Sequence, residues 1–76
     1  MPESTEVKIM FKLKELRVSK GLSQEALARL CGMSLTNVRK YEQGKMKSIP
    51  FNTLALFCSK LGCQPGELFE RVEVAA

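Results

Sequence analysis

Apolar side chains recur along most of this chain at the spacing of α-helices. The clearest stripe runs through residues 51–61 at positions i, i+3, i+4 and i+7, which are Leu54, Phe57, Cys58 and Leu61. Shorter stripes, bounded by glycine, serine or proline, extend the pattern to five helices over about 12–20, 24–31, 35–43, 51–61 and 65–69. The pattern therefore predicts one all-α, five-helix domain spanning residues 1–76.

Short polar residues and glycines mark the ends of the second and third of these helices. Ser23 and Ser34 precede them, and a serine at that place accepts a hydrogen bond from a free backbone N–H of the first turn. Gly32 and Gly44 follow them, and glycine ends a helix in the left-handed conformation at no steric cost. Residues 24–43 are therefore predicted to form a helix-turn-helix whose second helix exposes a polar, basic face.

The two ends of the chain show a different periodicity. Val7, Ile9 and Phe11 alternate with Lys8 and Met10, which is compatible with a short strand or with the first turn of a helix. Residues 70–74 also alternate, with Val72 and Val74 on one side, as a strand does. Two such strands can pair within one chain or between two chains, and frayed ends are the alternative. Residues 1–6 are expected to be loose, and the tail over 70–76 is a candidate dimer contact.

Positive charge is concentrated around the predicted helix-turn-helix. The net charge is +4, and ten of the twelve lysines and arginines lie between residues 8 and 47, with only three acidic residues among them. This distribution favours a polyanionic partner, although lysine-rich helices are also common on ordinary protein surfaces. Neither a membrane-spanning apolar run nor a signal-peptide pattern is visible, so the sequence predicts a cytoplasmic protein with no membrane partner.

The cysteines and the lack of histidine limit other chemistry. Cys31, Cys58 and Cys63 are an odd number on apolar helix faces, and a zinc site needs four ligands. Free thiols packed as small apolar side chains are therefore predicted. The sequence also shows no nucleophile with a base, no carboxylate pair in an apolar setting and no phosphate-binding glycine loop. No enzyme activity, cofactor, metal or small-molecule substrate is predicted.

Several residues of the helix-turn-helix form a known pattern: Ser23, Gln24, Ala28, Gly32, Ser34, Val38, Glu42 and Gly44. It continues downstream through Ile49-Pro50, Thr53-Leu54, Leu61-Gly62-Cys63 and Pro65-Gly66-Glu67-Leu68. In this order and spacing the residues resemble the Xre/Cro/cI-like helix-turn-helix family over roughly residues 12–70. The resemblance implies a lambda-repressor-like domain, double-stranded DNA as partner, a likeness to bacterial and phage regulators, and a homodimer that regulates transcription, by default a repressor.

In such a domain the third helix reads the major groove, and residues around it hold the phosphates. The expected base-reading residues are Leu35, Thr36, Asn37, Arg39 and Lys40. The expected phosphate ligands are Gln24, Ser34, Gln43, Gly44 (through its backbone N–H), Lys45 and Lys47. Solvated helix residues with no role in recognition are the alternative for Thr36 and Asn37.

Two of these residues admit a second interpretation. The resemblance implies that Gln24 contacts the DNA backbone or braces the reading helix, and a simple role in helix capping is the alternative. Leu35 departs from the polar residue that the family often has at this position. It either contacts a thymine methyl group or marks a surface that faces a protein. The rival function is therefore a protein-interaction module, such as an antitoxin or an accessory subunit.

Other residues are expected to have structural roles. Glu42 lies near the C-terminal end of the third helix, where a carboxylate is unfavourable, so an ion pair with Arg17 or Lys20 is predicted. Tyr41, Val38 and Phe57 are expected in the core. Dimerisation is expected to use the fifth helix and the tail, through Phe69, Val72 and Val74.

Overall fold

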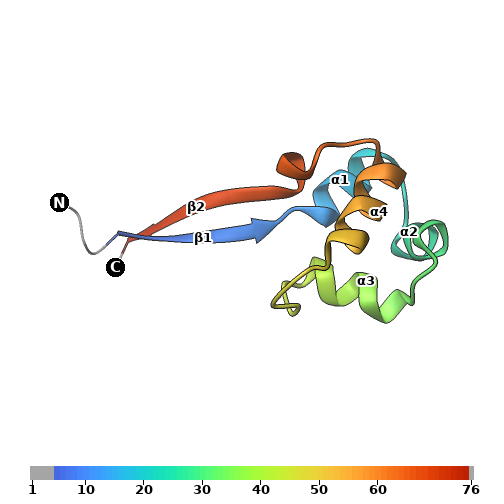
Figure 1. The fold of residues 1–76 in the computed structure, drawn as a ribbon, viewed down its shortest axis with the longest axis horizontal. Coiled ribbons are helices and arrows are strands. Elements are labelled where there is room, and N and C mark those ends of the chain that lie inside the picture. The colour runs from blue at the N-terminus through green and yellow to red at the C-terminus, as the bar shows by residue number, and fades with distance from the viewer. Residues whose placement is uncertain (1–4, 76) are drawn as a thin grey trace.

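The computed structural model describes residues 5–75, with side chains described from residue 6 to residue 74. A body of four α-helices and one 3-10 helix carries a two-stranded antiparallel arm (Figure 1). The elements in chain order are β1 (Thr5–Phe11), α1 (Leu13–Ser19), α2 (Gln24–Cys31), α3 (Leu35–Glu42), α4 (Phe51–Leu61), η1 (Pro65–Leu68) and β2 (Phe69–Ala75). No helix within this described part is long and apolar enough to cross a membrane.

The core of the helical body is built from one to three apolar side chains of each helix. The side chains that are at most 2% exposed are Leu13, Leu27, Val38, Phe57, Leu61 and Leu68. Tyr41 of α3 packs edge-on against Phe57 of α4, with ring centroids 5.5 Å apart. The prediction that Val38, Tyr41 and Phe57 belong to the core is therefore confirmed.

The arm explains the alternating pattern at both ends of the chain. β1 and β2 pair antiparallel within one chain, from Thr5 opposite Ala75 to Phe11 opposite Phe69. Figure 1 shows this ribbon extending away from the helices, and the described part of the molecule measures 46 × 22 × 22 Å. At the base of the arm the Phe11 and Phe69 rings lie 5.2 Å apart and join the helical core.

Two features differ from the predicted all-α, five-helix fold. Four helices are α-helical, but the expected fifth helix over 65–69 is a single 3-10 turn over Pro65–Leu68. This turn is capped by Gln64 and Glu67, each of which accepts a hydrogen bond from the backbone N–H of the other. The chain then leaves as a strand at Phe69, because an extended backbone here lets Phe69 pair with Phe11. The structure is therefore a helical body with a β-ribbon, as the strand alternative allowed.

The predicted loose N-terminus lies mostly outside the described residues. Within them, Thr5 and Glu6 already belong to β1, so this part of the prediction is wrong. The reason is the antiparallel partner strand β2, which provides cross-strand hydrogen bonds to this segment. The sequence of the N-terminal segment alone does not indicate that partner.

Candidate DNA-binding surface

The turn between α2 and α3 forms as the sequence predicts. The Ser23 hydroxyl accepts a hydrogen bond from the Ala26 N–H at 3.0 Å and starts α2. Gly32 ends that helix at φ 63°, and the Met33 N–H then donates to the Ala28 carbonyl at 3.0 Å. The Ser34 hydroxyl accepts from the Asn37 N–H at 3.1 Å and starts α3. The two caps and the left-handed glycine fix the angle at which α3 leaves α2.

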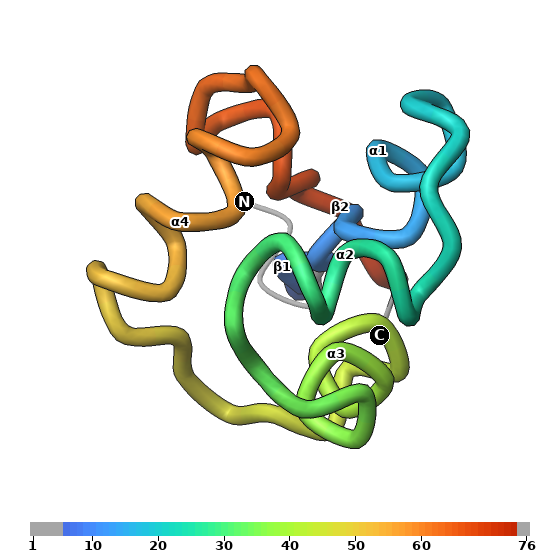
Figure 2. The backbone as a smooth tube through the Cα atoms, turned by 90° about the vertical axis from the view of Figure 1, so that its right-hand side faces the viewer, coloured from blue at the N-terminus to red at the C-terminus, as the bar shows by residue number. Residues whose placement is uncertain are grey.

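α3 has one buried and one exposed side. Val38 and Tyr41 face the core, whereas the exposed residues are Thr36, Asn37, Arg39, Lys40 and Gln43. Figures 1 and 2 both show α3 at the edge of the helical body, with no other element across its outer side. Leu35 is half-buried and so is less available than the other predicted base-reading residues. The remaining four predicted base readers share an accessible helix surface.

A buried ion pair fixes α3 against α1. The guanidinium of Arg17 donates to both carboxylate oxygens of Glu42, through Nε at 2.5 Å and Nη2 at 3.1 Å, and its Nη1 donates to the Leu22 carbonyl at 2.7 Å. The Arg17 and Glu42 side chains are only 10% and 3% exposed. The hydrogen bond with Glu42 raises the pKa of Arg17, against the opposing effect of burial. The predicted partner of Glu42 is therefore Arg17, not Lys20.

Gln24 extends this ion pair across the helix-turn-helix. Its amide Nε2 donates to Glu42 Oε1 at 2.9 Å, and its amide oxygen accepts from Arg39 Nε at 3.3 Å. The side chain at the start of α2 is thus joined to the last turn of α3 at two points. This geometry agrees with the bracing role that the resemblance implied for Gln24, and it orients the Arg39 guanidinium as well.

The loop after α3 places further cations beside the same surface. Lys45 and Lys47 are exposed, and Ser34 is exposed at the opposite end of α3. The prediction for the backbone N–H of Gly44 needs correction, because this N–H donates to the Tyr41 carbonyl at 3.3 Å. It closes the helix end together with the Lys45 N–H, which donates to the Lys40 carbonyl at 3.0 Å. Gly44 therefore shapes the loop and is not a free donor.

Sequence reasoning missed the breadth of the buried network. The sequence places Arg17 four residues after Leu13, on the same helix face, and both are buried. This i, i+4 relation was the available signal that Arg17 points inward. The link from Gln24 to Arg39 had no such signal, because the two residues belong to different helices.

No group of three or more metal-ligating side chains occurs within residues 5–75.

Comparison with known proteins agrees with this geometry. Residues 12–73 match the Cro/C1-type HTH DNA-binding domain family. The chain belongs to this family. An uncharacterised HTH-type transcriptional regulator of Bacillus subtilis, YozG, is 29% identical over 62 residues, which cover 82% of this chain and 74% of that protein.

Two solved structures are also similar to this chain. The restriction-modification controller protein C.AhdI of Aeromonas hydrophila is 38% identical, with a TM-score of 0.70 over 76% of this chain and 86% of that one. The hypothetical transcription factor NHTF from Neisseria is 34% identical, with a TM-score of 0.67 over 74% of this chain and 62% of that one. The predicted family and the prediction of a DNA-binding transcriptional regulator are confirmed.

Proposed function

We propose that this protein is a small repressor that binds a pseudo-palindromic operator as a homodimer, with one α3 in the major groove of each half-site. The observation that carries the proposal is the exposed polar side of α3, which the buried Arg17–Glu42 pair holds at the edge of the body. Family membership makes DNA the partner. In such a dimer, half-sites lie about 34–36 Å apart, and a bound dimer covers the DNA that polymerase would need.

Base reading is assigned to the exposed side of α3. Asn37 can pair bidentately with adenine, and Lys40 can reach guanine. Both lie on the accessible surface, together with Thr36, whose methyl group can contact thymine. Arg39 is held by Gln24 at one nitrogen, which leaves its other guanidinium nitrogens for a base or a phosphate. Leu35 is half-buried and stays a secondary candidate for a thymine contact.

Phosphate binding is assigned to residues on both sides of α3. Lys45 and Lys47 are exposed in the following loop, Ser34 and Gln43 are exposed at the two ends of α3, and Gln24 lies half-buried at the start of α2. Phosphate neutralisation supplies much of the affinity for DNA and makes it depend on salt. These residues are expected to set affinity, and α3 to set sequence preference.

A pair of substitutions in α3 and its loop tests this division. Asn37→Ala should cost about 1–3 kcal/mol of binding free energy at one base position of the selected site and leave the salt dependence unchanged. Lys47→Ala should weaken all duplexes alike and reduce the log–log salt slope by about 1. Lys60→Ala, in the last turn of α4, is the matched control for a lost lysine. Fluorescence anisotropy against salt measures all three variants. A Lys47→Ala slope equal to that of Lys60→Ala would contradict the assignment.

The arm supports dimerisation by a second copy of the chain. It consists of β1 and β2 alone, and a two-stranded ribbon is at best marginally stable in water by itself. Three large apolar side chains of β1 are exposed to solvent: Val7 is 52%, Ile9 64% and Met10 49% exposed. Val72 and Val74 of β2 are half-buried. The register puts Val7 and Ile9 on one face of the ribbon and Met10, Val72 and Val74 on the other, so a second arm packed on the first face would cover Val7 and Ile9.

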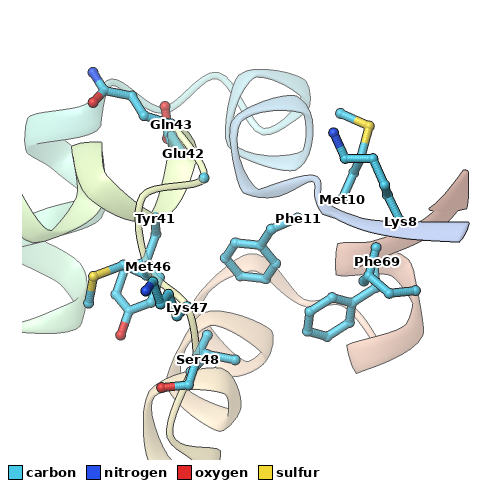
Figure 3. A pocket seen from close by; sticks show the side chains of 13 residues that line it. Lys8, Met10, Phe11, Tyr41, Glu42, Gln43, Met46, Lys47, Ser48 and Phe69 are labelled. Atoms are coloured by element: carbon cyan, nitrogen blue, oxygen red, sulfur yellow. The ribbon is translucent and has the colours of Figure 1, made fainter. Parts of the chain in front are cut away.

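The apolar surface continues into the base of the arm. An open groove of about 520 Å³ lies there, between β1 and the loop that follows α3. Figure 3 shows Phe11 and Phe69 on one side of the strand, with Lys8 and Met10 on the other, and Met46 across the groove. Phe11 and Phe69 of the groove lie on the same face of the arm as Val7 and Ile9, so a partner arm seated on that face would cover apolar side chains of both the groove and the arm.

Size-exclusion chromatography with light scattering tests the dimer. Ile9→Lys should convert a dimer to a monomer without loss of helicity, because Ile9 is already 64% exposed in the single chain. Val18→Lys is the matched control, since Val18 is 57% exposed but lies on α1. A parent protein that stays monomeric at high concentration, or a Val18→Lys effect equal to that of Ile9→Lys, would contradict the arm as dimer interface.

A further inference from the structure

Two cysteines meet where α4 ends. Gly62 takes the left-handed conformation, with φ 63° and ψ 43°, and turns the chain back on the helix. The Cys63 N–H then donates to the Cys58 carbonyl at 3.1 Å. In a helix end of this kind the side chains at these two positions commonly touch as an apolar pair. In this chain both positions carry a thiol.

The pair differs from the third cysteine in its surroundings. Cys58 and Cys63 are half-buried and are free thiols, whereas Cys31 is buried on α2 at 7% exposure. Burial raises the pKa of Cys63, and the charge and hydrogen bonding of the Cys58 thiol raise it further. Burial raises the pKa of Cys31, and the positive charge of Lys60 lowers it in part. Neither of the other cysteines contributes to this shift. The Cys58 thiol is therefore part of the surroundings of Cys63, and Cys31 stands apart from both.

We propose that Cys58 and Cys63 are a redox-active pair that forms a reversible disulfide across the end of α4. A small-molecule disulfide is the oxidant. One cysteine thiolate attacks it, forms a mixed disulfide and releases one small thiol. The second cysteine then attacks the cysteine sulfur of that mixed disulfide, forms the intrachain bond and releases the other small thiol. Two electrons and two protons pass from the pair to the oxidant.

The disulfide would join the end of α4 to the segment that leads into η1. η1 ends at the fully buried Leu68, whose carbonyl accepts from the Lys12 N–H at 2.6 Å. Figure 2 shows α3 and the C-terminal part of α4 at opposite sides of the helical body. Oxidation is therefore expected to raise the thermal unfolding midpoint and to leave DNA affinity within about twofold of the reduced protein.

Mass spectrometry of the whole protein tests the pair. The reduced protein is incubated with oxidised glutathione and then denatured and alkylated. The expected product is lighter by about 2 Da than the reduced chain before alkylation and carries a single alkyl group, at Cys31. Trypsin cleaves after Lys60, between the two cysteines, so the disulfide should link peptide 48–60 to peptide 61–71.

Single substitutions and unfolding supply the controls. Cys31→Ser should leave the link intact, whereas Cys58→Ser and Cys63→Ser should each stop at a stable mixed disulfide with glutathione. If folding positions the pair, the yield of the link should fall when the parent protein is oxidised in urea. Stable mixed disulfides on both cysteines of the folded parent, or equal linking in urea, would overturn the proposal. The peptide map of the parent decides it even where a variant does not fold, and it is independent of DNA binding.

Discussion

Replacing Arg17 by methionine tests whether the buried ion pair holds the reading helix. Methionine has a similar length and helix propensity, so the change leaves α1 itself largely unaffected. It removes the two hydrogen bonds to Glu42 and the one to the Leu22 carbonyl. Glu42, with a side chain only 3% exposed, then keeps the amide of Gln24 as its remaining donor.

The size of the effect follows from burial. Removing one partner of a buried ion pair costs about 3–5 kcal/mol, because the other charge stays buried without compensation. A 76-residue chain has a free energy of unfolding of about 4–11 kcal/mol in total. Arg17→Met should therefore remove a large part of the stability, and it should lower DNA affinity at temperatures where the variant is partly unfolded.

Urea denaturation followed by circular dichroism measures the loss. Lys20→Met is the matched control, because Lys20 was the other candidate partner of Glu42 and is exposed, so its change should stay within about 0.5 kcal/mol. The double variant Arg17→Met/Glu42→Met removes both charges and should recover at least half of the loss. A cost below about 1 kcal/mol for Arg17→Met, or no recovery in the double variant, would refute the reasoning.

Three further predictions concern the turn and the thiols. Gly32→Ala should lower the free energy of unfolding in urea by about 1–2 kcal/mol. An added Cβ meets no atom within 4 Å, so the cost comes from the backbone angle φ 63° alone. An unchanged urea midpoint would contradict this prediction. Ser34→Ala should cost about 1 kcal/mol through the lost cap of α3, visible as a lower thermal midpoint. Burial raises the pKa of Cys31 and Cys63 above the ordinary 9.0, so the unfolded chain releases these protons first. The free energy of unfolding should thus fall as pH rises past 9.0, and it should fall less in Cys63→Ser than in the parent protein. An equal fall in the two proteins would argue against a role of the Cys63 thiol in this pH dependence.

Local signals predicted most of the helical body. The serine caps and Gly32 act within a few residues of one another, so their effect can be read from neighbouring positions. The predicted helix over 65–69 proved to be a 3-10 turn over Pro65–Leu68, because Phe69 pairs as a strand with Phe11, which is far away in sequence. Alternation allowed strands at both ends and their pairing with each other, but it did not distinguish pairing within one chain from pairing between two chains.

The candidate site was predictable to a similar degree. Exposure of Thr36, Asn37 and Lys40 followed from the period of α3, and the structure has them exposed. The partner of Glu42 could be narrowed to two residues, but the choice of Arg17 depends on the crossing of α1 and α3, which a helical pattern does not contain. The role of Gln24 needs two contacts across the turn and is visible only in three dimensions.

The central claim is that the exposed side of α3, with the loop that follows, is the surface that lies on duplex DNA. Nuclear magnetic resonance of the ¹⁵N-labelled protein, titrated with its selected duplex at about 50 mM salt, tests it most directly. The largest amide shift changes should fall in residues 34–47, with little change in the last two turns of α4. Largest changes along β1 and β2, or no change at this low salt, would contradict the claim.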